Sequence, residues 1–163
     1  MKVITAPEKG WPDHYWTVFL AGGITGCTNW QEQVISELIH LSDYYDLSNV
    51  VIFNPRRDNF DIADTNAEIE QIKWEYERLK RCNIFSCFFE ANEWLQPIAL
   101  YEMGKWSTKK PSVITVQKGY LRERDVLIQT ALDKLQVSYI PNEDAIKHHA
   151  RMIASKIQEV RGR

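Results

Sequence analysis

The chain has 163 residues, of which 44% are hydrophobic and 26% charged, and its formal net charge is −2. These totals are typical of a globular protein with one domain over residues 1–163, and they disfavour a surface that binds a nucleic acid polymer. No apolar run approaches about 18 residues and the start lacks a signal-peptide pattern, so we expect no membrane contact and a cytoplasmic location. The cysteines and histidines form no metal-binding pattern, which predicts no metal and no cofactor; His148 and His149 are expected at the surface.

Strands and helices are predicted to alternate along the chain. Residues 1–16 contain Pro7, Gly10 and Pro12 and are expected to form an irregular lead-in. Short apolar runs predict five strands, at 17–22, 50–53, 83–89, 112–117 and 137–140. Apolar residues at helical spacing predict helices at 29–41, 67–82, 97–107, 124–132 and 142–160. Asn29 is the expected N-cap of the first helix, and Thr65 or Asn66 that of the second.

This alternation predicts an α/β fold, a doubly wound five-stranded parallel sheet with helices on both faces. In such folds the ligand binds beyond the carboxyl ends of the strands, at the point where the strand order reverses. The rule selects four loops, at 22–29, 54–65, 90–96 and 117–122.

Two of these loops have a composition suited to binding. Gly22 and Gly23 follow the first strand and permit positive φ and close approach of the backbone to a ligand. The spacing is not GxGxxG, so a tight turn and a binding loop remain equally open. In the second loop, Arg56 and Asp58 stand in a charged run that fits either a binding site or a solvated turn with a local ion pair.

Glu102 stands in the stretch "QPIALYEMGKW", soon after the most apolar run of the chain. With Pro97 at the first helical position, Glu102 falls in the second turn and is expected to share a face with Ile98, Ala99, Lys105 and Trp106. Gly104 is expected to let this helix lie close to the sheet. Since a buried, unpaired carboxylate is costly, Glu102 either points to solvent or is held in a cleft for a purpose.

Four stretches carry a resemblance to a known family: "FLAGGITG", "NPRRDNF", "QIKWEYERLKRCNIFSCFF" and "QPIALYEMG", in this order. They resemble the nucleoside 2-deoxyribosyltransferase-like family, whose members exchange bases or hydrolyse deoxynucleotides. The resemblance implies a flavodoxin-like homo-oligomer, a dimer or larger, with its site at the strand ends. It implies that Glu102 is the nucleophile and that Glu75 donates a proton to the leaving base, whereas Glu77 faces elsewhere on the helix.

The resemblance also implies where a nucleoside or nucleotide binds. The residues expected to bind it are Gly22, Gly23, Ile24, Arg56, Asp58, Gln96, Tyr101 and Asp125. The family's transferases tend to carry Asp, and its monophosphate hydrolases Ser, where this chain has Gln96. Because Gln96 is neutral and the arginines have acidic neighbours, we favour a nucleoside over a monophosphate. Asp125, or Arg124 beside it, is expected to reach a neighbouring subunit's site.

Two other functions are compatible with the fold. A non-catalytic nucleotide-binding module would keep the fold but would not need a carboxylate beside Tyr101 and Gly104. A flavodoxin-like protein that binds FMN or a dinucleotide is disfavoured, because the chain has neither GxGxxG nor a Ser/Thr-rich phosphate loop after the first strand.

Overall fold

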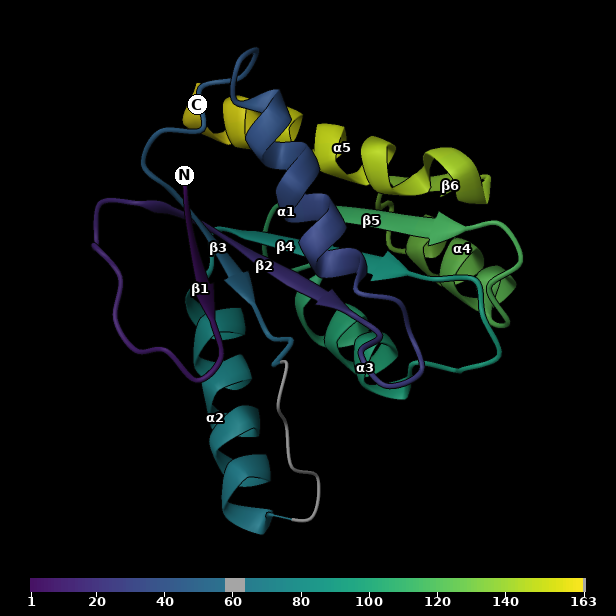
Figure 1. Ribbon diagram of the computed structural model, residues 1–163. Coiled ribbons are helices and arrows are strands. Elements are labelled where there is room, and N and C mark those ends of the chain that lie inside the picture. The colour runs from purple at the N-terminus through teal and green to yellow at the C-terminus, as the bar shows by residue number, and fades with distance from the viewer. Residues whose placement is uncertain (58–63, 163) are drawn as a thin grey trace.

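The structure, a computed structural model, describes residues 1–57 and 64–162. A parallel sheet of six strands runs through it in the order β1-β3-β2-β4-β5-β6 (Figure 1). The strands are β1 Lys2–Thr5, β2 Trp16–Gly22, β3 Val50–Asn54, β4 Ile84–Phe89, β5 Ser112–Gln117 and β6 Val137–Ile140. The helices are α1 Trp30–Leu41, α2 Thr65–Arg81, α3 Pro97–Trp106, α4 Glu123–Leu132 and α5 Ala145–Arg161, with a 3-10 turn at Asn142–Asp144.

The order β3-β2-β4-β5-β6 confirms the predicted doubly wound, flavodoxin-like arrangement. The chain leaves β2 toward β3 on one side and then crosses back to form β4 on the other side of β2. The strand order therefore reverses between β2 and β4, and the loops after these two strands flank the place where ligands bind in such folds.

The predicted strand count of five is wrong, because the lead-in of residues 1–16 contains β1. This strand has four residues and pairs on one side only, with β3. In this pairing Lys2 lies opposite Val51. Ile4 is its one buried side chain, and Pro7 and Gly10 follow closely. A short, half-exposed edge strand leaves too weak an apolar pattern to be recognised from sequence.

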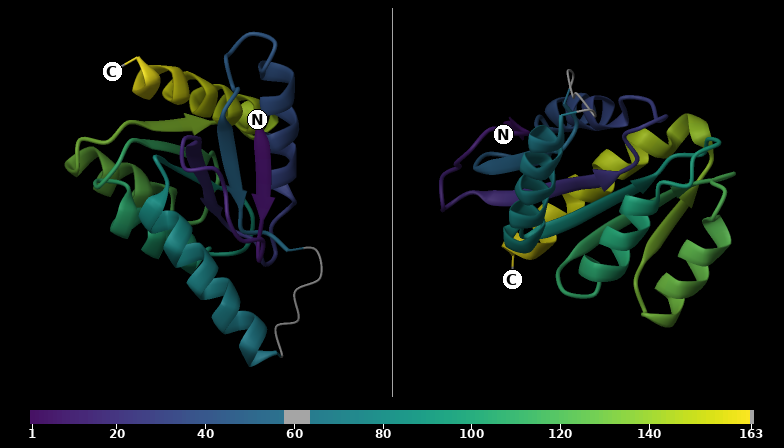
Figure 2. Two further views of the ribbon diagram at one scale, coloured as in Figure 1. Left: turned by 90° about the vertical axis from the view of Figure 1, so that its left-hand side faces the viewer. Right: turned by 90° about the horizontal axis from the view of Figure 1, so that it is seen from below.

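Helices cover both faces of the sheet. In Figure 2, α1 and α5 lie on one face and α2, α3 and α4 on the other. Alternate side chains of β2 divide between two cores, since Val18 and Leu20 pack with α1 and α5, whereas Phe19 packs with α2 and α3. Among the described helices, none is long and apolar enough to cross a lipid bilayer.

Local sequence signals set the helix ends. The side chain of Asn29 accepts a hydrogen bond from the backbone N–H of Glu32, which confirms the predicted N-cap of α1. The cap of α2 is Asp64 and not the expected Thr65 or Asn66. Pro97 begins α3 as predicted, but the preceding Gln96 has a left-handed backbone with φ 50°. This conformation is unusual for a residue with a side chain.

The surface position predicted for His149 is wrong. His149 is fully buried on α5, and its two ring nitrogens lie 2.8 Å from Ser86 Oγ of β4 and 2.8 Å from Thr115 Oγ1 of β5. Burial lowers the pKa of His149 to about 3, so the ring is neutral and links α5 to two central strands.

Candidate active site

Glu102 is buried on the face of α3 that packs against the sheet. Its neighbours on that face are Ala99, Met103 and Trp106, and Glu102 itself is 7% exposed. Its carboxyl group lies near the thiol of Cys87 on β4, whose pKa is raised by burial and then by the charge of Glu102. The sheet therefore forms one wall around this carboxyl group.

Glu75 extends from α2 toward the same place. Its side chain is half-buried, and Gln71 Nε2 donates a 2.7 Å hydrogen bond to Glu75 Oε1. Burial raises the pKa of Glu75. Burial, and secondly the charge of Glu75, raise the pKa of Glu102 from 4.5 to about 8, although Lys105 acts in the opposite direction.

With a pKa of about 8, the carboxyl group of Glu102 keeps its proton near neutral pH. The charge of Glu75 contributes to this shift, because ionising one carboxyl group makes ionising the other harder. A pair with one proton offers both a carboxylate and a carboxylic acid. This combination suits a reaction that needs a nucleophile and a proton donor.

Side chains join the loops that follow β2 and β4. Gly23 N donates to Gln96 Oε1 at 3.2 Å, and Gln96 Nε2 donates to the carbonyl of Glu90 at 2.7 Å. The carboxylate of Glu90 in turn accepts hydrogen bonds from Thr28 N at 2.9 Å and Thr28 Oγ1 at 2.5 Å. Because Gln96 directly precedes α3, these bonds fix the start of the helix that carries Glu102.

The two glycines after β2 are required by packing. A Cβ on Gly23 would lie 2.4 Å from Cys27 Sγ and 2.7 Å from Gln96 Cγ, and one on Gly22 would lie 2.4 Å from a ring carbon of Trp30. Gly22 has φ +155°, whereas Gly23 has no positive φ. A tight turn thus accounts for both glycines, and their contact with a ligand stays a prediction.

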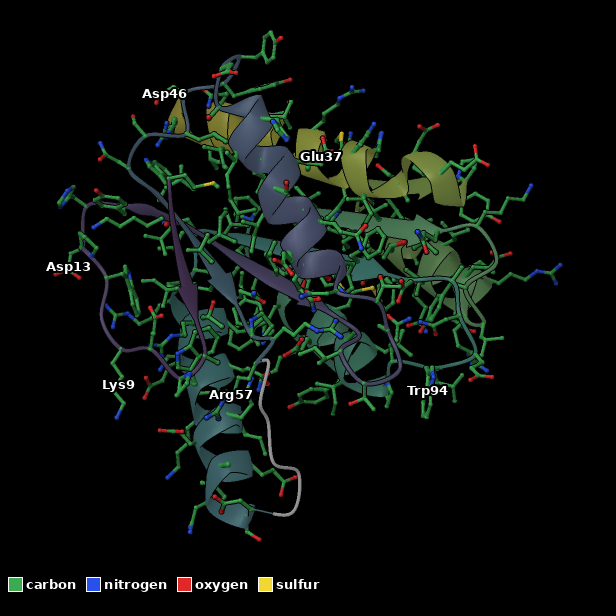
Figure 3. The ribbon with its side chains drawn as sticks, in the orientation of Figure 1. Lys9, Asp13, Glu37, Asp46, Arg57 and Trp94 are labelled. Atoms are coloured by element: carbon green, nitrogen blue, oxygen red, sulfur yellow. The ribbon has the colours of Figure 1, made fainter. Side chains whose placement is uncertain are left out.

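The guanidinium group of Arg56 is engaged within the protein. It donates to the carbonyl groups of Thr28 at 2.5 Å and Cys27 at 3.0 Å and to Gln31 Oε1 at 3.2 Å. Arg57, which Figure 3 shows beside α2, lies 3.7 Å from the carboxylate of Glu70. Asp58, expected to bind substrate, lies outside the described residues.

Comparison with known proteins assigns the family. The family model described as "Nucleoside 2-deoxyribosyltransferase like" matches residues 15–120, a span that includes Glu75, Gln96 and Glu102. The chain belongs to the nucleoside 2-deoxyribosyltransferase-like family. Membership supports a nucleoside deoxyribosyltransferase-like enzyme that acts on a small nucleoside-type molecule.

Two further comparisons add little. No curated protein sequence matches the chain. Among solved structures, the NAD(P)H:quinone oxidoreductase from Methanothermobacter marburgensis is similar at 12% sequence identity, covering 86% of this chain and 95% of that chain, with a TM-score of 0.40. A likeness at this TM-score carries no argument about function.

Tyr101, Asp125 and Ile24, which were also expected to bind substrate, have exposed or half-buried side chains. Tyr101 is 64% exposed on the outer side of α3, where Lys105 Nζ lies 3.3 Å from its hydroxyl group. Asp125 lies on α4 and pairs with Arg122 at 2.8 Å. Ile24 is half-buried in the loop after β2. Gly104 is exposed, and a Cβ there would meet nothing within 4 Å, so the predicted close approach of α3 to the sheet at Gly104 is wrong.

Sequence analysis of this family member missed Glu90. Its side chain is 8% exposed, and it holds the loop after β2 through Thr28. The signal was present, because Glu90 directly follows the fully buried strand β4 at one side of the switch point.

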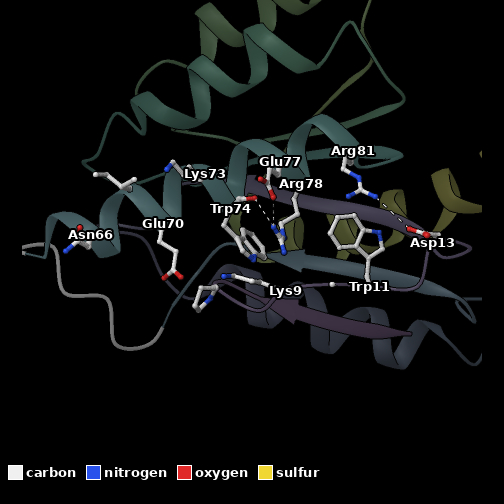
Figure 4. A pocket seen from close by; sticks show the side chains of 13 residues that line it. Lys9, Trp11, Asp13, Asn66, Glu70, Lys73, Trp74, Glu77, Arg78 and Arg81 are labelled. Carbon is white, nitrogen blue, oxygen red and sulfur yellow. Dashed lines mark hydrogen bonds and ion pairs between the residues drawn. The ribbon is translucent and has the colours of Figure 1, made fainter.

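Two hollows of the described surface lie away from the carboxyl pair. One hollow of about 680 Å³ lies between residues 7–13 and α2 (Figure 4), and another of about 460 Å³ lies between α1 and the start of α5. Neither is lined by Glu75 or Glu102. Within residues 1–57 and 64–162, no cluster of three or more His, Cys, Asp or Glu side chains could hold a metal ion.

Proposed function

We propose that this protein cleaves or exchanges the N-glycosidic bond of a (deoxy)nucleoside through a covalent intermediate on Glu102. The observation that carries the proposal is the buried carboxyl group of Glu102, 7% exposed, whose pKa is raised to about 8 by burial and then by the charge of the half-buried Glu75. Family membership supports the same class of reaction.

The first half-reaction uses both members of the pair. Burial favours the proton on Glu102, so this proton passes to Glu75 before Glu102, as the carboxylate, attacks the anomeric carbon C1′ of the sugar and the bond from C1′ to the base nitrogen breaks. The electron pair of that bond leaves with the base, which takes the proton of Glu75. The oxocarbenium-like transition state carries positive charge, which the carboxylate of Glu102 stabilises.

The second half-reaction releases the sugar. Water, or a nitrogen of an incoming base, attacks C1′ and breaks the ester bond to Glu102. Glu75, now ionised, takes the proton that the attacking group loses, which restores the starting pair. Water as the acceptor gives a hydrolase, and a base gives a transferase.

We favour a neutral nucleoside over its 5′-monophosphate. Arg56 donates to two backbone carbonyl groups and to Gln31, and Arg57 lies 3.7 Å from Glu70, so both cations near the strand ends already interact with other groups. Recruiting either for a phosphate would require breaking contacts within the protein. Gln96 is neutral and its amide is already bonded to Gly23 N and to the carbonyl of Glu90, so it supplies no charge for a phosphate either.

A homo-oligomer would complete the site in this proposal. Large apolar side chains on α3 and α4 are more than half exposed, namely Ile98, Tyr101, Ile128 and Leu132. Exposed apolar surface on neighbouring helices is typical of a protein interface. A second copy on this surface would bring Asp125 or Arg124 toward the other subunit's site.

The second candidate is a non-catalytic nucleotide-binding module. One observation favours it: the side chain of Glu102 is only 7% exposed. An enzyme must admit its substrate to the nucleophile, whereas a binding module need not.

A substrate panel separates these functions. The protein is incubated with nucleosides and their 5′-monophosphates, with and without a free acceptor base, and released or exchanged base is measured by chromatography. We expect base release from a nucleoside with a higher kcat/KM than from its monophosphate. A preference for the monophosphate of more than about tenfold, roughly 1.4 kcal/mol, would contradict the nucleoside assignment. No release or exchange from any compound would favour the binding module.

A further inference from the structure

A groove runs along α2 on a side that the carboxyl pair does not use. Residues 7–13 form one wall and α2 the other, and the enclosed volume of about 680 Å³ is within the range of small-molecule sites. Glu70, Lys73 and Glu77 line the groove at helical spacing of three or four residues, whereas Glu75 does not line it. In Figure 4, Lys9, Trp11 and Asp13 face this side of α2 from the opposite wall.

In the groove, two guanidinium groups lie over aromatic rings. The guanidinium carbon of Arg78 lies 4.3 Å from the ring centre of Trp74 and 5.3 Å from that of Trp11. Arg81 lies 4.5 Å from the Trp11 ring. Trp74 is held by a 2.7 Å hydrogen bond from its Nε1 to the carbonyl of Glu8. Such planes present flat surfaces to a planar ligand.

Arg78 is a buried cation with incomplete pairing. Its side chain is 4% exposed, and its nearest carboxylate, that of Glu77, is 3.7 Å away and 70% exposed. One terminal nitrogen donates to the carbonyl of Glu8 at 2.7 Å, but Nε has no hydrogen-bond partner among the described residues. A buried charge and a buried unpaired donor both cost free energy, which an anionic group in the groove would reduce.

The remaining charges leave the groove cationic. Four cationic side chains line it, against three carboxylates: Lys9, Lys73, Arg78 and Arg81 against Asp13, Glu70 and Glu77. Asp13 lies 3.8 Å from Arg81, longer than a hydrogen bond. In the described part of the chain, neither Lys9 nor Lys73 has a hydrogen bond or an ion pair. Both lysines are therefore available to an anion.

We propose that this groove binds a planar aromatic molecule that carries an anionic group, of the size and chemistry of a nucleoside monophosphate. The aromatic ring packs against Trp11, and the anionic group is held by Lys9, Lys73 and Arg78. The site is separate from Glu75 and Glu102, so it does not depend on the proposed catalytic function.

Binding is measured by isothermal titration calorimetry on the full chain carrying Glu102→Gln, so that turnover cannot consume the ligand. The probes are the 5′-monophosphates of adenosine, guanosine, cytidine and uridine, the four free nucleosides, and inorganic phosphate. We expect at least one monophosphate to bind below about 1 mM, and at least about tenfold more tightly than its nucleoside and than phosphate.

The position of the bound molecule is tested by charge removal. Lys9→Ala combined with Lys73→Ala should weaken monophosphate binding by about tenfold or more, because each lysine supplies a charge-assisted contact. The matched control is Lys80→Ala, an exposed lysine on α2 that does not line the groove, and it should leave affinity unchanged within about twofold. The proposal is overturned if no monophosphate binds below about 1 mM, or if the double variant and the control have equal affinity.

Discussion

At the scale of single residues, the buried carboxyl group of Glu102 makes the stability of the protein depend on pH. In the unfolded chain it ionises near its ordinary value of 4.5, whereas in the folded protein its pKa is about 8. Between these values the unfolded state has lost a proton that the folded state keeps. Stability from this group is therefore present below pH 4.5 and is lost as pH rises toward 8.

Replacing Glu102 by Gln should remove the loss of folding stability with rising pH, because the amide cannot ionise. We expect Glu102→Gln to gain stability relative to the unmodified protein as pH rises from 5 to 8, with an upper limit of roughly 5 kcal/mol. Urea unfolding at a series of pH values measures the difference. A constant difference over this range would show that Glu102 has an ordinary pKa and is not desolvated.

Glu75 should be part of the cause of the raised pKa of Glu102. We expect Glu75→Gln to lower the pKa of Glu102, because its negative charge is removed while the burial of Glu102 remains. A carboxyl-carbon NMR titration of Glu102 measures this directly. Glu77→Gln, two residues further along α2 and exposed, is the matched control and should leave the titration unchanged. If Glu102 has the same pKa in both variants, its carboxyl group does not interact with that of Glu75.

At the scale of elements, the position of α3 depends on the loops that precede it. Gln96 bonds Gly23 of one loop and Glu90 of the other, and its backbone is left-handed. A strained conformation persists when its surroundings hold it, so these two hydrogen bonds stabilise the entry into α3.

Removing the amide of Gln96 should therefore destabilise this junction. We expect Gln96→Ala to cost about 2–4 kcal/mol, since the N–H of Gly23 and the carbonyl of Glu90 each lose a buried partner. Leu95→Ala, at an exposed neighbouring position, is the control and should cost less than about 1 kcal/mol. Denaturant unfolding measures both. Equal costs would show that the amide bonds do not hold α3.

The strands and helices predicted from the sequence are marked by patterns of neighbouring residues, whereas the hydrogen bonds between the two loops are not. Strands β2 to β6 have dense apolar runs, and Asn29 and Pro97 mark helix starts by their own chemistry. The bonds of Gln96 to Gly23 and of Glu90 to Thr28 join residues more than sixty positions apart. No local pattern encodes such pairs, because only the folded sheet brings the two loops together.

At the scale of the whole molecule, the parallel sheet decides which distant residues can act together. Glu75 comes from a helix that follows β3, and Glu102 from one that follows β4, yet both lie on the same face of the sheet. The same arrangement leaves the groove between residues 7–13 and α2 on another side of that helix. One face of the fold thus holds both the proposed catalytic pair and a separate proposed binding site.

The most direct test of the proposed catalysis is the rate of base release by Glu102→Gln, compared with the unmodified protein and with Glu77→Gln. Rates are measured on the best nucleoside of the panel, with circular dichroism to confirm that each variant is folded. We predict that Glu102→Gln is slower by roughly three orders of magnitude or more, because the nucleophile is lost, whereas Glu77→Gln stays within about twofold. A folded Glu102→Gln protein with a rate near that of the unmodified protein would contradict the assignment of Glu102 as the nucleophile.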